Sequence, residues 1–411
     1  MAGPVKRGTA AVVSPLRAFL HAESAGGIVL VVAAAVALVW ANSPMADGYA
    51  QFWQRKITLG GGQARVSHDL RHWINDGLMV LFFFVIGLEI KRELVVGELR
   101  DRRAARLPAL AAVGGVALPA LIYVALAGGG DAGRGWGIPM ATDIAFAVGI
   151  LALLGRHASG GAKLFLLSVA IVDDILAIGV IAIFYTARVD LWWLATAVAG
   201  LVAAAGMRRL GVNSPWGYVP IGLLVWFATL ESGVHATLAG VALGLLTPAR
   251  PVAGRAVLDD LERTLHPVSA FLVIPVFALA NAGVDVRGGA LGDAFGQPMT
   301  WAVIAGLVVG KVVGIGGVTY LVRRLRWGAL PADMHYREIL GVAALGGIGF
   351  TVSLFITDLA FTDTTLIGQA KVGILTASAL AALVGAVLLL MAPAGTGATS
   401  APERNDDHSG N

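Results

Sequence analysis

The chain has 411 residues, of which 57% are hydrophobic and only 14% charged, and its formal net charge is +4. A soluble domain carries about 25% charged residues, so the composition excludes an ordinary water-soluble fold and indicates a membrane protein. The absence of cysteine excludes disulfides and thiolate metal sites, and the lack of a basic tract interleaved with aromatic residues argues against a nucleic-acid partner.

The N-terminal segment carries Lys6, Arg7 and Arg17 before the first apolar run. These cations fit a signal peptide, but no convincing cleavage site follows, and a retained first helix obeys the same charge rule. We expect retention. Residues 1–14 and 392–411 are polar and contain glycine, proline or serine, so both tails are expected to be disordered. Residues 15–391 are expected to form a single membrane domain.

Hydrophobic runs and their breakers predict an all-α polytopic membrane fold with twelve transmembrane helices, each close to the roughly 20 residues that cross a bilayer. If both termini are cytoplasmic, lysine and arginine in cytoplasmic segments outnumber those in external segments by about three to one, which supports the count. The predicted spans are residues 24–42, 70–93, 105–127, 134–155, 161–184, 191–207, 215–230, 233–248, 266–284, 299–321, 337–357 and 368–391.

The loop at 50–67 differs from the other connections. Two strand-like runs, Phe52–Leu59 and Gln63–Val66, flank a triple glycine and predict a β-hairpin. An isolated hairpin is marginally stable in water, so a partner edge would stabilise it. The alternative is a linker without fixed structure.

Four charged residues lie deep in the predicted spans: Asp143, Asp173, Asp174 and Lys311. A charge at the centre of a membrane helix costs about 2.5–3.5 kcal/mol, so such residues usually mark function. Buried ion pairs that only fix helix packing are the alternative. Three carboxylates and one ammonium cannot all form ion pairs, because negative charge would remain unpaired, and this argues against that alternative.

Asp173 and Asp174 are neighbours on one helix, so their side chains point about 100° apart. One is expected to face an ion path and the other a partner in the bundle, for which Lys311 is the only deep cation available. Burial and a like-charged neighbour favour the protonated form of a carboxyl group, so the pair can hold protons or a hard cation. The simplest stoichiometry is the release of two protons for each cation that binds, although Lys311 could supply one of the two protons.

Two of the predicted spans are interrupted. Pro139 and nearby glycines precede Asp143 in the fourth span, and the stretch 345–351 is glycine-rich in the eleventh. Close packing would explain the second stretch equally well, but two broken spans in opposite halves indicate a transporter built from repeats. Asp143 would balance the positive N-terminal helix ends, and Lys311 the negative C-terminal ends.

A second polar group lies at the end of the second span, where Glu89 and Glu93 share a helix face and Arg92 lies within reach of both. Ordinary solvated ion pairs are the alternative there. His235 titrates in the range of a pH sensor, although a lone histidine in a helix is more often a packing residue, and His266 calls for the same caution.

These segments resemble the NhaA family of bacterial sodium–proton antiporters. The resemblance runs in the family's order through residues 84–94, 141–147, 172–174, 232–240, 265–267, 310–311 and 347–351. It implies a multi-pass protein of the bacterial inner membrane with both termini cytoplasmic, built from inverted repeats, whose fourth and eleventh helices cross as broken helices at the midplane. It also implies a homodimer through the hairpin at 50–67 on the periplasmic side, with no soluble protein partner.

The resemblance implies a secondary transporter and not an enzyme: an electrogenic, pH-regulated exchanger of sodium or lithium for protons that needs no cofactor. Asp174 would be the main cation ligand, Asp173 would share the site and pair with Lys311, and Thr142 and Asp143 would lie at the crossing. The positions that it ties to pH-dependent activation are Glu89, Arg92, Glu93, His235 and Glu262. Asp259, Asp260 and Arg263 depart from the family pattern beside Glu262, which bears on the pH set point and not on transport.

Two other functions compete with exchange. An intramembrane aspartyl protease also uses two membrane aspartates, but on separate helices and commonly in a Gly-x-Gly-Asp motif, whereas here the pair is adjacent and Phe350 follows Gly349. A cation channel would conduct without proton exchange. The titratable aspartate pair favours exchange over conduction.

Overall fold

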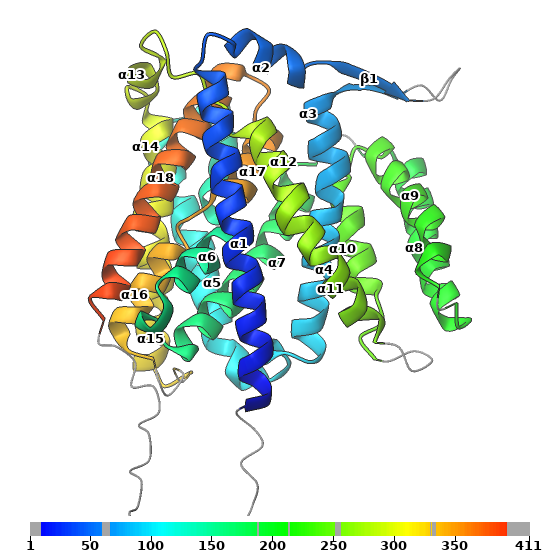
Figure 1. Cartoon of the computed structure of the whole chain (residues 1–411), viewed down its shortest axis with the longest axis horizontal. Helices are drawn as coiled ribbons and strands as arrows, with labels where there is room; N and C mark the ends of the chain where they lie inside the picture. The colour runs from blue at the N-terminus through cyan, green and yellow to red at the C-terminus, as the bar shows by residue number, and fades with distance from the viewer. Residues whose placement is uncertain are drawn as a thin grey trace, which may run out of the picture.

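The structure is a computed structural model that describes residues 10–59, 66–186, 189–212, 214–250, 256–328, 330 and 334–392. These residues form a helical bundle with a two-stranded sheet at one end, which we call the hairpin end (Figure 1). Helix α1 (Ala10–Ala41) begins, and helix α18 (Thr364–Leu390) ends, at the opposite end. Residues 1–9 and 393–411 of the expected tails lie outside the described residues.

Apolar helices dominate the described part of the chain. Seven are long and apolar enough to cross a membrane, or up to ten if each of three bent helix pairs is one span. Helices α9 (Pro215–Glu231) and α10 (Thr237–Leu246) are shorter but also apolar. The chain is therefore a multi-pass helical membrane protein, and the count of twelve spans stays a prediction. The seven helices are Leu70–Val95, Arg102–Leu126, Gly160–Phe184, Leu191–Arg209, Val257–Asn281, Pro298–Arg324 and Thr364–Leu390.

The predicted β-hairpin is present, with shifted bounds. Strand β1 (Lys56–Leu59) pairs antiparallel with β2 (Val66–Asp69). The expectation that a strand begins at Phe52 is wrong, because helix α2 (Ala46–Trp53) continues through that residue and buries Tyr49 and Trp53 on one face. The triple glycine and the run from Gln63 to residue 65 lie outside the described residues.

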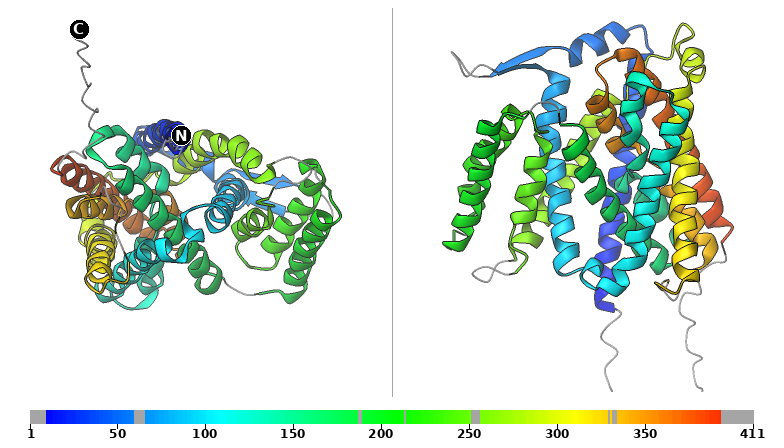
Figure 2. Two further views of the ribbon diagram at one scale, coloured as in Figure 1. Left: turned by 90° about the horizontal axis from the view of Figure 1, so that it is seen from below. Right: turned by 180° about the vertical axis from the view of Figure 1, so that it is seen from behind.

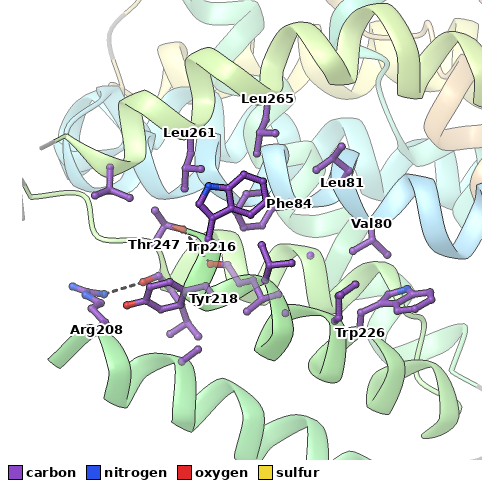
Figure 3. Close-up of a pocket in the computed structure, with 18 of the residues that line it drawn as sticks. Val80, Leu81, Phe84, Arg208, Trp216, Tyr218, Trp226, Thr247, Leu261 and Leu265 are labelled. Carbon is purple, nitrogen blue, oxygen red and sulfur yellow. Dashed lines mark hydrogen bonds between the residues drawn. The ribbon is translucent and has the colours of Figure 1, made fainter. Parts of the chain in front are cut away.

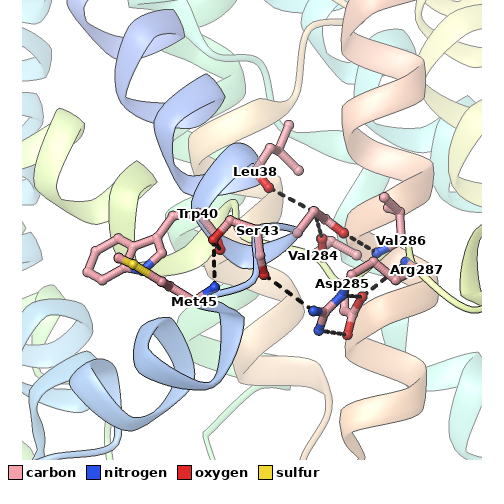
Figure 4. Close-up of polar contacts among 9 residues, drawn as sticks. Leu38, Trp40, Ser43, Met45, Val284, Asp285, Val286 and Arg287 are labelled. Carbon is pink, nitrogen blue, oxygen red and sulfur yellow. Dashed lines mark hydrogen bonds and ion pairs between the residues drawn. The ribbon is translucent and has the colours of Figure 1, made fainter.

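The end of α1 is tied to the loop that follows α12 (Ile274–Asn281). The Asn42 side chain donates to the Val284 carbonyl at 2.8 Å and accepts from the Val286 amide at 2.8 Å. In the same loop Arg287 donates to both carboxylate oxygens of Asp285 (Figure 4), and these hydrogen bonds lower the pKa of that carboxyl group to about 2. The loop is therefore fixed to the hairpin end by paired polar contacts.

Three of the long spans contain a π-helical turn, a feature that often occurs at functional sites. The first consists of α3 (Leu70–His72), η1 (Trp73–Leu78) and α4 (Met79–Val95). The second consists of α11 (Val257–Val268), η5 (Ser269–Val273) and α12. The third consists of α14 (Pro298–Ala305), η6 (Gly306–Gly310) and α15 (Lys311–Arg324).

Helices α5, α7 and α8 begin at side chains that cap free backbone N–H groups. Asp101 accepts from the Arg103 amide at the start of α5 (Arg102–Leu126), and Ser159 accepts from the Ala162 amide at the start of α7 (Gly160–Phe184). Helix α8 (Leu191–Arg209) begins in the same way at Asp190. Figures 1 and 2 show α8 and α9 together at one edge of the bundle. The short elements are η2 (Glu98–Arg100), η4 (Gly155–His157) and α13 (Ala290–Phe295).

Two glycine contacts let helix backbones approach closely. A Cβ atom on Gly240 would lie 2.3 Å from the Val80 carbonyl oxygen, where α10 packs on α4, and one on Gly314 would lie 2.3 Å from the Gly114 carbonyl oxygen, where α15 packs on α5. Helix α5 also packs on α7, which carries Asp173 and Asp174. The close approach at Gly314 therefore brings Lys311, one turn away, toward the aspartate pair.

Candidate functional site

Two bent helix pairs meet at the centre of the bundle. The 3-10 helix η3 (Gly130–Met140) and α6 (Ile144–Leu153) form one pair, and α16 (Tyr336–Leu345) and α17 (Phe350–Ala360) form the other. Each pair is bent by 44° at a short break. The breaks touch, because the Asp143 amide donates to the Ile348 carbonyl at 2.6 Å. A backbone N–H group that is left free at the first break is thus satisfied by a backbone carbonyl group at the second break.

Asp143 caps a helix on each side of this contact. Its Oδ1 accepts from the Phe146 amide at 3.0 Å, and its Oδ2 accepts from the Thr351 amide at 3.1 Å and the Thr351 hydroxyl at 2.7 Å. The N-terminal ends of α6 and α17 therefore both point at one carboxylate, whose negative charge suits the positive ends of the helix dipoles. The residue is 2% exposed.

Asp173 lies in a closed polar group with Thr142 and Lys311. The Lys311 Nζ lies 2.6 Å from Asp173 Oδ2 and 3.1 Å from the Thr142 hydroxyl. That hydroxyl lies 2.8 Å from both Asp173 Oδ2 and the Gly346 carbonyl oxygen, and its single proton serves one of them at a time. The second carboxylate oxygen, Asp173 Oδ1, is buried without a hydrogen-bond partner.

Asp174 points away from that group, as its neighbouring position on the helix requires. It lines a cavity of about 540 Å³ together with Thr142, Asp143 and Thr351. Glu89 and Asp143 line the same cavity, and Asp173 precedes Asp174 on α7. Among the described residues, no hydrogen bond or ion pair engages the Asp174 carboxyl group. Its oxygens are therefore available to a proton or a cation that enters the cavity.

The cavity continues to a second polar cluster. Arg92 pairs with Glu262 and lies 3.8 Å from the Glu93 carboxylate. His266 lies 4.0 Å from Glu89, and both residues line the cavity. The structure thus joins the helix end at 89–93 to α11 and places the resulting cluster at the wall of the cavity that Asp174 also lines.

The structure places His235 apart from this cluster. Its Nε2 lies 2.7 Å from the Tyr185 carbonyl oxygen, and the residue does not line the cavity of Asp174. Sequence reasoning did not select Thr351 as a site residue, although it follows the glycine-rich break. It named His266 only with caution, and the structure places this residue in the cavity wall, four residues after Glu262.

A larger cavity, of about 720 Å³, lies between the α8–α9 pair and helices α4, α10 and α11 (Figure 3). Its lining is mostly apolar and includes Trp216, Trp226 and Leu265. Arg208 lies at its margin, where it donates to the Leu246 carbonyl at 3.0 Å. The smaller cavity is the candidate ion site, because it alone of the two is lined by acids: Glu89, Glu93, Asp143 and Asp174.

Comparison with known proteins identifies the family of the chain. The family model described as "Na+/H+ antiporter 1" matches residues 17–389. The Na+/H+ antiporter NhaA 3 of Frankia alni is 47% identical over 91% of this chain and 88% of its own length. NhaA 1 of Erythrobacter litoralis is 46% identical, covering 95% and 96%, and NhaA 2 of Pseudomonas putida is 45% identical, covering 90% and 91%. The chain belongs to the NhaA family of Na+/H+ antiporters, multi-pass proteins of the inner membrane.

Proposed function

We propose that this chain is an electrogenic antiporter that expels one sodium or lithium ion in exchange for two protons. The observation that carries the proposal is the contrast between the two adjacent aspartates. Asp173 is fully buried and bound by Lys311, whereas Asp174 lines the cavity and is free to bind a ligand. Exchange of two protons for one monovalent cation moves one net charge per cycle, which would make transport electrogenic.

The contacts support a division of roles. A cation that reaches the cavity finds the carboxylate oxygens of Asp174, with Thr142 and Asp143 beside it, and oxygen is the ligand that hard cations prefer. The first proton leaves Asp174 when the cation binds. The second comes from Asp173 or from Lys311, and the short contact between those two is consistent with either source.

We further propose that the two bent helix pairs are discontinuous transmembrane helices that cross at the midplane of a fold with twelve spans and inverted repeats. The touching breaks and the common cap at Asp143 support that arrangement. In this orientation both termini are cytoplasmic and the hairpin is periplasmic. The arginine and lysine distribution supports the orientation.

Regulation by pH is assigned to Glu89, Arg92, Glu93, Glu262 and His235. The first four contact one another or line the cavity, so a change in their charge would act on the path to Asp174. His235 would act from a separate position, through its contact with the Tyr185 carbonyl. The homodimer is assigned to the hairpin, whose edges are available to a second copy.

Proton movement in everted vesicles tests the proposal. Addition of sodium or lithium should release protons from the acidified lumen, and potassium should not, when the assay is repeated from about pH 6.5, near the ordinary pKa of histidine, to about pH 9. A channel would carry sodium current without proton movement. Failure of sodium to move protons at every pH tested would refute the antiporter proposal.

A further inference from the structure

A second buried polar cluster lies toward the hairpin end, and the proposed exchange site does not include it. It consists of Asn75 in η1, Asn281 at the end of α12, Asp358 in α17 and Lys371 in α18, and we call it the Asp358 cluster. Figure 1 shows α3, α12 and α17 in the part of the bundle nearest the hairpin. Its residues come from four separate spans, so no local helix contact explains their meeting.

The cluster is connected but incompletely satisfied. The Asn75 side chain donates to Asp358 Oδ2 at 3.0 Å and accepts from the Asn281 amide group at 2.8 Å. Asn281 is fully buried, and its Oδ1 has no hydrogen-bond partner among the described residues. A buried carbonyl oxygen without a partner is costly unless something else binds it, and a cation is one group that would do so.

Lys371 and Asp358 form a loose ion pair. The Lys371 Nζ lies 3.7 Å from Asp358 Oδ1, beyond hydrogen-bond distance, whereas the Lys311 pair with Asp173 closes to 2.6 Å. The Asp358 side chain is 16% exposed, whereas that of Asp173 is fully buried. A carboxylate has room for about four hydrogen-bond or metal contacts, so Asp358 keeps capacity for another ligand.

A layer of three aromatic rings separates this cluster from the cavity of Asp174. The rings of Phe83 and Phe355 lie 5.3 Å apart, those of Phe277 and Phe355 lie 6.4 Å apart, and all three side chains are buried. Each phenylalanine lies three residues from a residue that lines the cavity, on α4, α12 and α17 respectively. These cavity residues are Ile86, Ile274 and Val352.

The order along the helices is the same in all three spans. Each one presents a cavity residue, then a phenylalanine, and then a member of the Asp358 cluster: Asn75, Asn281 or Asp358. At 1.5 Å per residue, the cluster lies about 10 Å beyond the cavity along α12 and α17. Oxygen atoms that could bind a cation thus lie on both sides of a buried aromatic layer, along the same three spans.

We propose that the Asp358 cluster is a second binding site for the transported monovalent cation, on the hairpin side of the aromatic layer. Its ligands are oxygens of Asp358, Asn75 and Asn281, and the Lys371 ammonium, 3.7 Å from Asp358 Oδ1, competes with the cation for that carboxylate. When the aromatic layer opens, the cation passes between Asp174 and this site. The inference rests on the proposed function, because it concerns the same transported ion.

Sodium-driven exchange by reconstituted full-length protein tests the site, in vesicles of both orientations. Asp358→Asn should lower the maximal rate at least about tenfold, the loss expected for one charge-assisted contact, without raising the half-saturating sodium concentration at the face opposite the hairpin. Lys371→Gln removes the competing ammonium and should lower the half-saturating concentration at the hairpin face. Asp285→Asn is the matched control, because this acid also forms an ion pair at the hairpin end but is exposed, and its exchange should equal that of the wild type.

A purely structural ion pair would behave differently. Asp358→Asn and Lys371→Gln would then lower the unfolding temperature, the double variant would restore it, and exchange per folded molecule would stay unchanged. That result, or wild-type exchange by Asp358→Asn, would overturn the second site alone. Absence of sodium-driven proton movement in the wild type and in the Asp285→Asn control would overturn the proposed function, and the second site with it.

Discussion

Lys311 Nζ lies 2.6 Å from Asp173 Oδ2, and neither side chain is exposed. The contact joins α15 to α7 at the point where the two helix breaks meet. A buried ion pair adds little net stability relative to apolar residues, but loss of one partner leaves an uncompensated charge. The pair therefore holds a charge next to the Asp174 cavity that packing alone would not require.

The first prediction concerns that pair. Lys311→Ala should destabilise the protein by about 3–5 kcal/mol, because Asp173 then keeps a buried charge without a partner. The double variant with Asp173→Asn should recover most of this loss. Thermal unfolding in detergent measures both. A single variant as stable as the wild type would show that Asp173 is not held as an anion by Lys311.

The second prediction concerns the contact of α15 with α5. Gly314→Ala should destabilise by about 1–3 kcal/mol, the usual penalty for overpacking, because its Cβ atom would lie 2.3 Å from the Gly114 carbonyl oxygen. Gly317→Ala in the same helix meets no atom within 4 Å and should be neutral or slightly stabilising. Equal unfolding temperatures for the two variants would contradict this close approach.

The third prediction concerns Asp143 as a cap for two helices. Asp143→Ala should cost about 0.5–2 kcal/mol for each cap that is lost, whereas Asp363→Ala removes the cap of α18 alone. The loss of stability in denaturant unfolding should therefore be about twice as large for Asp143. A smaller loss for Asp143 than for Asp363 would argue against the double cap.

The fourth prediction concerns pH dependence. Arg92 supplies a positive charge beside Glu262, and such a charge favours the ionised form of a carboxyl group. Arg92→Ala should therefore move the pH of half-maximal exchange upward, by up to about one unit. Arg100→Ala, at an exposed position just beyond the same helix, is the control. Unchanged profiles for both variants would remove this cluster from regulation.

The fifth prediction concerns the hairpin. Deletion of residues 56–69 with a short glycine–serine replacement should convert the proposed homodimer to monomers, because the pairing edge is lost. Mass determination in detergent with correction for bound detergent measures the change. Dimers that persist after the deletion would place the interface elsewhere on the protein.

Much of the helical architecture was predictable because hydrophobic runs and their breakers mark membrane helices strongly. The break before Asp143 was visible through Pro139, and the second break through its run of glycines. The bounds of β1 were not predictable from the sequence, because Phe52 and Trp53 have high strand propensity. Both residues nevertheless belong to α2, where the burial of Trp53 favours the helix over a strand.

The residues of the candidate site were easier to predict from the sequence than the contacts between them. Adjacent positions on a helix already separate the directions of Asp173 and Asp174. The meeting of Asp358, Asn75 and Asn281 was not predictable, since it depends on how three distant spans pack. Lys371 appeared in the sequence only as a cation near the end of a span, and its partner Asp358 fell outside the predicted eleventh span.

The central claim is that Asp174 binds the transported cation. Asp174→Asn keeps the size of the side chain and removes its charge, so the variant should insert and unfold like the wild type. Reconstituted into proteoliposomes, it should show no sodium-driven proton movement and no exchange of radioactive sodium. Sodium–proton exchange at the wild-type rate by correctly folded Asp174→Asn would contradict the account.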